Sequence, residues 1–96
     1  MCTYRTETLA AGGAGKGATG WFPLELASVY VDHPTHALLD HSLNIDFLNP
    51  SNGPSARVAV ELDTASARAL AEAILTALDT APPGMTGGVE EAAAPG

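Results

Sequence analysis

Hydrophobic and polar residues alternate over two stretches in the middle of the chain, residues 42–48 and 56–62. A period of two is typical of a β-strand with one apolar face. The turn-rich run 49–55 separates the two stretches, so we expect a hairpin. Asn44 and Asp46 are expected to face solvent, with Asp46 opposite Arg57 and Glu61 in a cross-strand ion pair. The residues expected to face the core are Leu43, Ile45, Phe47, Val58, Val60 and Leu62.

Two further strands are predicted nearer the N-terminus, over residues 2–9 and 21–32. Both faces of the second are partly apolar, which favours a central position in a sheet. The glycine-rich segment 10–20 between them is expected to be a flexible connection. Its Gly-x-Gly-x-x-Gly pattern at 15–20 does not indicate a dinucleotide site, because a strand follows it and not a helix.

One helix is predicted from Asp63, a good N-cap residue, to Thr80. Leu70, Ile74 and Leu78 recur every four residues and form a narrow apolar stripe. The prediction is therefore an α+β fold in β-β-β-β-α order, a four-stranded antiparallel sheet with one C-terminal helix packed on one face. Residues 1–80 are expected to form this single domain, and residues 81–96 a disordered tail rich in Gly, Pro, Ala and Glu.

The charge balance limits the classes of partner. Eleven acidic residues against four basic ones give a net charge of −7, which repels a phosphate backbone, so no nucleic acid partner is expected. No apolar run approaches membrane-spanning length and no signal peptide is recognisable, so no membrane partner is expected. A single cysteine rules out an internal disulfide. These features predict a cytoplasmic protein.

All three histidines of the chain, His33, His36 and His41, lie within nine residues. In a simple antiparallel meander, the strand before this run ends where the next begins, and the first strand starts at the same end of the sheet. Cys2 is thereby predicted to lie near the histidines. Imidazole and thiolate are common ligands of transition metals. We therefore predict a site for one metal ion, zinc first, with copper or iron as alternatives.

The role of such a site stays open at this point. A shell that includes Cys2 is closed, which is typical of a structural or sensing site. Three histidines with an open fourth position resemble a catalytic shell for hydrolytic or oxygen chemistry. The same run also fits an ordinary polar turn with solvated histidines.

Two other interpretations compete with a metal protein. The first is a metal-free homodimeric interaction module that uses an exposed sheet face with Trp21, Phe22 and Tyr30. A homodimer is expected in either case, because one helix covers only one side of a sheet. The second is a small enzyme that uses His36 or His41 as a general base with a carboxylate partner. Its substrate is not indicated by the sequence.

Four segments carry a resemblance to a known family. They are Met1-Cys-Thr-Tyr-Arg-Thr-Glu7, Lys16-Gly-Ala-Thr-Gly-Trp-Phe22, the run from Tyr30 to Pro50, and Gly53-Pro-Ser-Ala-Arg-Val-Ala-Val-Glu-Leu62. In these segments the chain resembles a small uncharacterised family of actinobacterial proteins of about ninety residues, a domain of unknown function. The resemblance implies no activity and no set of ligands.

Overall fold

A computed structural model describes residues 5–86 of the 96-residue chain. The chain divides into two compact units, Met1–Thr64 and Ala65–Gly96. The strands all belong to the first unit, and nearly all of the helix belongs to the second.

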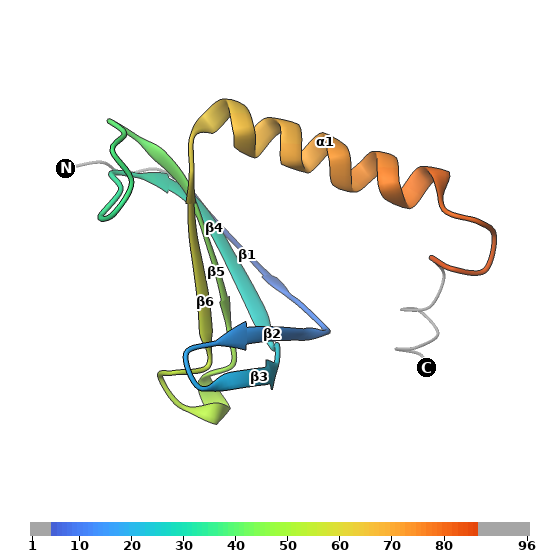
Figure 1. Cartoon of the computed structure of the whole chain (residues 1–96), viewed down its shortest axis with the longest axis horizontal. Helices are drawn as coiled ribbons and strands as arrows, with labels where there is room; N and C mark the ends of the chain where they lie inside the picture. The colour runs from blue at the N-terminus through green and yellow to red at the C-terminus, as the bar shows by residue number, and fades with distance from the viewer. Residues whose placement is uncertain (1–4, 87–96) are drawn as a thin grey trace. The chain divides into compact units, whose positions relative to one another are not determined.

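The main sheet of the first unit has four antiparallel strands in the order β1-β4-β5-β6 (Figure 1). Together with the C-terminal helix, this sheet confirms the predicted α+β class and the sequential pairing of neighbouring strands. The predicted and observed strands agree best in the middle of the chain, since β5 covers the predicted residues 42–48. The strands are β1 (Thr6–Ala10), β4 (Leu26–Asp32), β5 (Ser42–Leu48) and β6 (Arg57–Leu62).

A second, two-stranded sheet lies within the segment that was expected to be a flexible connection. It pairs β2 (Ala14–Gly17) with β3 (Gly20–Pro23), so the prediction of a loop over 10–20 and of one continuous strand over 21–32 is wrong. Gly17 explains the difference, because its backbone passes so close to β6 that a Cβ there would lie 2.9 Å from the carbonyl oxygen of Ser55. The β2–β3 hairpin thereby rests against β6, a contact between residues far apart in sequence.

The two faces of the main sheet differ in chemistry. Residues directly opposite one another on neighbouring strands share a face, so the strand register assigns every side chain. One face is apolar apart from Glu7. The other, here called the polar face, carries Thr6, Thr8, Ser28, Tyr30, Asp32, Ser42, Asn44, Asp46, Arg57 and Glu61.

Burial on β5 is the reverse of the prediction. Asn44 and Asp46 were expected to face solvent, yet each is only 9% exposed, and Ser42 is fully buried. The apolar residues on the other face of β5 are half-buried. The alternation itself is correct. What differs is which face of β5 is shielded from solvent. Side chains of β4 and β6, including Tyr30 and Arg57, hydrogen-bond across β5 and shield its polar face.

The aromatic residues expected on one exposed sheet face are separated. Trp21 is exposed on β3, whereas its neighbour Phe22 is one of the few buried apolar residues of the described chain. Tyr30 lies on the polar face of β4 and donates a hydrogen bond to Asp46. The expectation that these three residues form one exposed face is therefore wrong, because Trp21 and Phe22 point to opposite faces of β3 and a break in the strand at Leu24 and Glu25 separates both from Tyr30.

The turn between β5 and β6 is organised by Asn49. Its side chain accepts a hydrogen bond from the N–H of Ser51 at 3.1 Å, at the start of the short helix η1 (Pro50–Asn52). The same side chain donates to the carbonyl oxygen of Pro23 at 2.7 Å. Asn49 thus ties the turn to the end of β3, which helps to position the β2–β3 hairpin.

The second unit contains the helix α1 (Thr64–Thr80), which begins directly after Asp63 as predicted. Its apolar stripe, Leu70, Ile74 and Leu78, is exposed. Packing of this helix on the sheet stays a prediction, as does the single-domain boundary at residue 80. Residues 87–96 of the predicted tail lie outside the described part of the chain. Within residues 5–86, no helix combines the length and the apolar character needed to cross a membrane.

Candidate functional site

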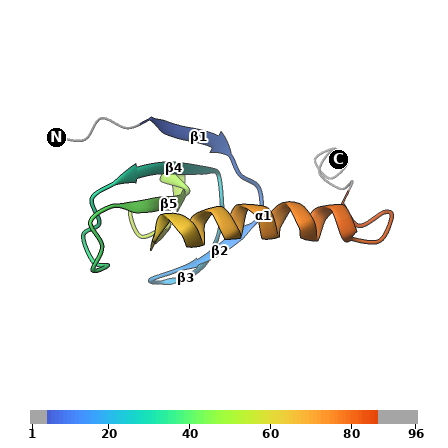
Figure 2. The same ribbon diagram turned by 90° about the horizontal axis from the view of Figure 1, so that it is seen from above.

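The three histidines lie on the loop between β4 and β5, here called the histidine loop (residues 33–41). The loop extends beyond the ends of β4 and β5 (Figure 2) and lies at the opposite end of the sheet from the β2–β3 hairpin (Figure 1). The antiparallel register brings the start of β1, the end of β4, the start of β5 and the end of β6 to this same end. The predicted gathering of chain segments at one end of the sheet is correct for the described strands.

The loop brings two of the histidines together. The ring centroids of His33 and His41 are 4.7 Å apart, with an angle of 32° between the ring planes. The Nδ1 atom of His33 lies 3.0 Å from the carbonyl oxygen of Asp40. Because a carbonyl oxygen only accepts, this contact requires a proton on Nδ1 of His33.

His36 has different neighbours. Its Nδ1 atom lies 2.9 Å from the hydroxyl of Thr35 and 3.8 Å from a carboxylate oxygen of Glu61. Over residues 5–86, no group of three or more His, Cys, Asp or Glu side chains has an arrangement that would hold a metal ion. Cys2 lies outside these residues. The described chain thus assembles a histidine pair, and the predicted four-ligand set of His33, His36, His41 and Cys2 stays a prediction.

Glu61 anchors the histidine loop to the sheet. Its two carboxylate oxygens accept hydrogen bonds from the backbone N–H groups of Thr35, His36 and Ala37, at 2.8 to 2.9 Å. The hydroxyl of Thr35 donates a fourth bond at 2.8 Å. The N–H groups of Thr35 and Ala37, followed by the Thr35 hydroxyl, lower the pKa of Glu61 from 4.5 to about 2. The loop therefore closes around a carboxylate that stays ionised at neutral pH.

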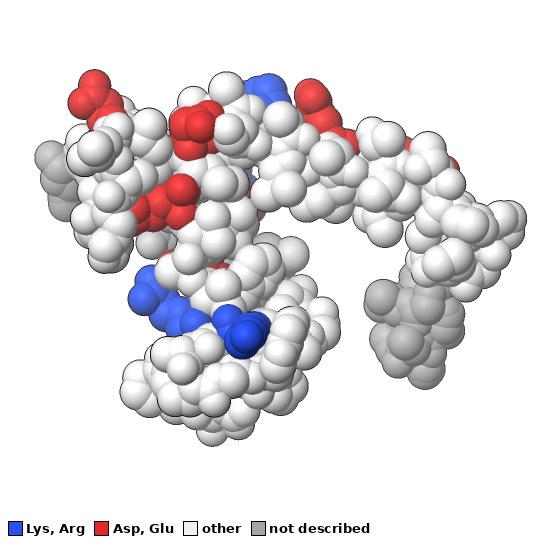
Figure 3. Space-filling view, in the orientation of Figure 1, with Lys and Arg blue, Asp and Glu red and all other residues white. Residues whose placement is uncertain are grey.

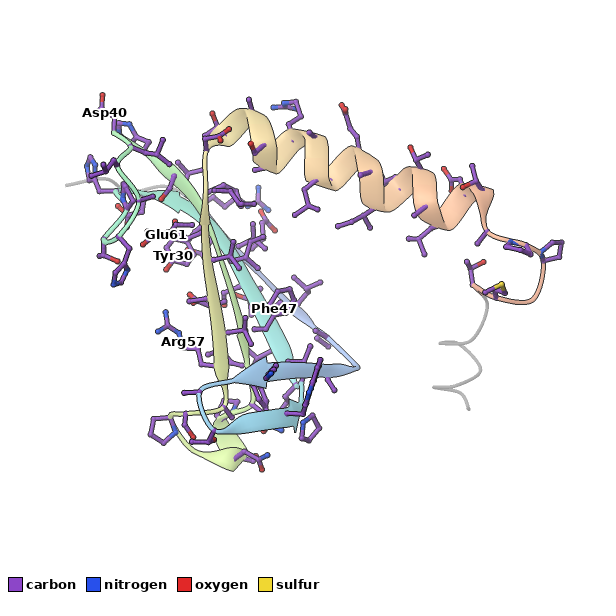
Figure 4. All side chains as sticks on the ribbon, viewed as in Figure 1. Tyr30, Asp40, Phe47, Arg57 and Glu61 are labelled. Atoms are coloured by element: carbon purple, nitrogen blue, oxygen red, sulfur yellow. The ribbon has the colours of Figure 1, made fainter. Side chains whose placement is uncertain are left out.

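A second network lies deeper on the polar face. Arg57 donates two hydrogen bonds, from Nε and Nη2, to one carboxylate oxygen of Asp46 at 3.1 and 2.7 Å. Tyr30 donates to the other oxygen at 3.2 Å. Figure 4 shows Tyr30, Arg57 and Glu61 on the same side of the sheet, with Phe47 on the other. The cross-strand ion pair that the sequence predicts for Asp46 and Arg57 is present.

These side chains line a pocket of about 240 Å³ on the polar face. Asp32 and His33 line it at the histidine-loop end, and Arg57 lies further along β6. Asn44 also lines the pocket. The pocket therefore has the carboxylate of Asp32 at one end and the ion pair of Arg57 with Asp46 at the other. In Figure 3 acidic and basic atoms lie near one another on the visible face of the first unit.

The sequence did not indicate Glu61 as a site residue, and it indicated Tyr30 only as part of an exposed interaction face. Glu61 was predicted only as a polar residue on the same face as Arg57. A signal was present in the alternating pattern, because Tyr30 on β4 and Arg57 and Glu61 on β6 fall on one side of their strands. What the pattern lacked was the register between strands and the path of the loop. Both are needed to show that Glu61 faces residues 35–37.

No curated protein and no solved structure matches the chain significantly. Residues 1–87, which include both networks and the histidine loop, match a family of unknown function. Since this match covers most of the 96 residues, the chain belongs to that family, DUF6295.

Proposed function

We propose that this protein binds one transition-metal ion, zinc first, at His33 and His41. The observation that carries the proposal is the approach of the two rings to a centroid distance of 4.7 Å on one short loop. The contact of His33 Nδ1 with the Asp40 carbonyl supports it, because metal-ligating histidines typically hydrogen-bond through the nitrogen that does not bind the metal. Copper and iron also accept imidazole ligands and are alternatives.

Cys2 is the candidate third ligand. It precedes β1, and the first residues of β1 pair with the last residues of β4, which lead directly into His33. Thiolate and imidazole together form a common zinc shell. His33, His41 and Cys2 leave the fourth tetrahedral position open, and a metal there would be able to lower the pKa of a bound water for hydrolytic chemistry. A fourth protein ligand would close the shell, which is typical of a structural or metal-sensing site.

The test is elemental analysis with native mass spectrometry on untagged protein. About one zinc per chain is expected, since a single site is proposed. His33→Ala and His41→Ala should each lose the metal. His36→Ala is the matched control, because it removes the same side chain from the same loop but from the side that contacts Glu61. Full metal retention in His33→Ala, or no uptake after incubation with zinc or copper, would contradict the proposal.

A second candidate function is a homodimeric interaction module, with a second copy of the chain as the partner. The observation that favours it is the apolar face of the main sheet, whose β5 residues Leu43, Ile45 and Phe47 are only half-buried. Burying such a surface stabilises association in proportion to its apolar area. Sedimentation equilibrium tests it: a dimer should persist in chelator and be weakened by Ile45→Lys. A monomer at every concentration would contradict it.

The same proposal extends to the location and the source of the protein. A cytoplasmic location follows from a site that includes a reduced thiol at Cys2. An actinobacterial source follows from the sequence resemblance and suits the alanine-rich composition.

A further inference from the structure

The side chain of Asn44, which lines the pocket on the polar face, forms fewer hydrogen bonds than its amide group allows. Asn44 is 9% exposed, and its amide forms one side-chain hydrogen bond, in which its oxygen accepts from the hydroxyl of Ser42 at 2.5 Å. The other amide atom has no partner among the described residues and lies at the pocket wall. This atom is accessible from the pocket, since no buried side-chain nitrogen or oxygen of the described residues lacks a partner, and a ligand in the pocket would be able to hydrogen-bond to it.

The two ends of the pocket differ in their charged groups: one has the ion pair of Arg57 with Asp46, and the other has Asp32. The carboxylate of Asp46 is already paired, since Arg57 and Tyr30 donate three hydrogen bonds to it. Those bonds use Nε and Nη2 of Arg57 and leave Nη1 for an anion. At the other end Asp32 lines the pocket. One carboxylate oxygen of Asp32 accepts from the N–H of His33, and its negative charge remains to attract a cation.

We propose that this pocket binds a small zwitterionic amino compound, with its carboxylate at Arg57 and its ammonium group at Asp32. Arg57 hydrogen-bonds to Asp46, and Asp32 lies opposite Ser42 on β5. The two ends of the pocket are therefore four positions apart on β5, which is about 13 Å along the strand. With a hydrogen bond of about 3 Å at each end, a ligand with about 7 Å between its charges spans that length. This inference does not depend on the metal site.

Three probes of equal chain length test the proposal on the full chain in the presence of chelator. They are 5-aminopentanoate, which carries both charges, pentanoate, which carries only the anion, and pentylamine, which carries only the cation. Amide shifts of ¹⁵N-labelled protein report binding. We expect 5-aminopentanoate to shift residues around Asn44 and to bind at least about tenfold more tightly than either singly charged probe, because it uses both ends of the pocket.

Variants then assign the ends of the pocket. Arg57→Gln and Asp32→Asn should each weaken 5-aminopentanoate about tenfold, whereas Lys16→Gln, on the exposed β2–β3 hairpin, should leave it unchanged. If Arg57→Gln disturbs the fold, Asp32→Asn decides. Equal binding of pentanoate or pentylamine, equal binding to Asp32→Asn, or no shift with any probe at millimolar concentration would overturn the proposal.

Discussion

At the scale of single residues, Glu61 has the largest effect on the shape of the site. One carboxylate on β6 accepts hydrogen bonds from three consecutive backbone N–H groups of a loop that lies 24 to 26 residues earlier in the chain. A loop with several polar residues has many conformations of similar energy. Four hydrogen bonds to an ionised acceptor select one of them. Glu61 thereby fixes the backbone at His36, in the middle of the histidine loop.

The order of the histidine loop should therefore depend on acidity in a defined window. Because folding lowers the pKa of Glu61 from 4.5 to about 2, the folded loop favours the ionised form. The stabilisation is fully present above pH 4.5 and is lost as the pH falls through about 2. Amide shifts of Thr35, His36 and Ala37 should report this titration. A midpoint near 4.5 would contradict the assigned hydrogen bonds.

Glu61→Gln tests the same contacts at neutral pH. The amide keeps one acceptor oxygen but loses the charge and the second acceptor. Hydrogen exchange at residues 35–37 should accelerate by about tenfold, since charge-assisted hydrogen bonds are replaced by weaker ones. The acid titration of these amides should also disappear. Leu38→Ala is the control on the same loop, because Leu38 is fully exposed and takes no part in the anchor.

Tyr30→Phe isolates one bond of the second network. It removes the hydroxyl that donates to Asp46 at 3.2 Å and keeps the ring. The free energy of unfolding should fall by about 1 kcal/mol, the usual net contribution of one hydrogen bond. Urea denaturation measures the change. An unchanged unfolding midpoint would show that water replaces the hydroxyl without loss.

At the scale of elements, the β2–β3 hairpin depends on close approach to β6. A Cβ at Gly17 would meet backbone oxygens of Ser55 and Arg57 at 2.9 and 3.3 Å and the ring of Phe22 at 3.1 Å. Gly17→Ala should therefore lower the free energy of unfolding by about 1 to 3 kcal/mol, a typical cost of overpacking.

Gly12→Ala is the matched control for the hairpin. Nothing lies within 4 Å of a Cβ at Gly12, and its backbone lies outside the left-handed region. This substitution should leave stability unchanged or raise it by about 0.5 kcal/mol, because alanine restricts the unfolded chain. Thermal unfolding of the two variants compares them directly. An equal loss of stability in Gly17→Ala and Gly12→Ala would contradict the close approach of β2 to β6.

At the scale of the whole molecule, the described chain buries few apolar side chains. Its buried apolar residues are Phe22, Ala27 and Ala56, which is a small core for the number of residues that must be ordered. Small domains of this kind often gain stability from a metal or from a second subunit. The proposed metal site and the proposed dimer therefore both predict a dependence of stability on conditions.

Zinc should raise the unfolding temperature of the wild-type chain. A ligand present at 100 times its Kd stabilises the folded state by about 2.7 kcal/mol if it binds only that state. The gain should disappear with chelator and in His41→Ala, and it should persist in His36→Ala. Calorimetry with and without zinc measures it. An equal gain in His41→Ala would assign the zinc to other residues.

The elements that could be predicted from the sequence are those whose signals lie within a short stretch of the chain. The strand over 42–48, the strand that ends at Leu62 and the helix over 64–80 follow from the alternation of side chains, the turn residues between the strands and Asp63 before the helix. The ion pair of Asp46 with Arg57 follows as well, because a short hairpin fixes its own register.

The features that depend on contacts between segments far apart in the chain could not be predicted from the sequence and are seen in the folded structure. The β2–β3 hairpin requires the close passage of Gly17 over residues 55–57. The separation of His36 from His33 and His41 requires Glu61 to hold residues 35–37. Neither contact has a periodic signature in the sequence, because each joins a loop to a strand by backbone groups that every residue type provides.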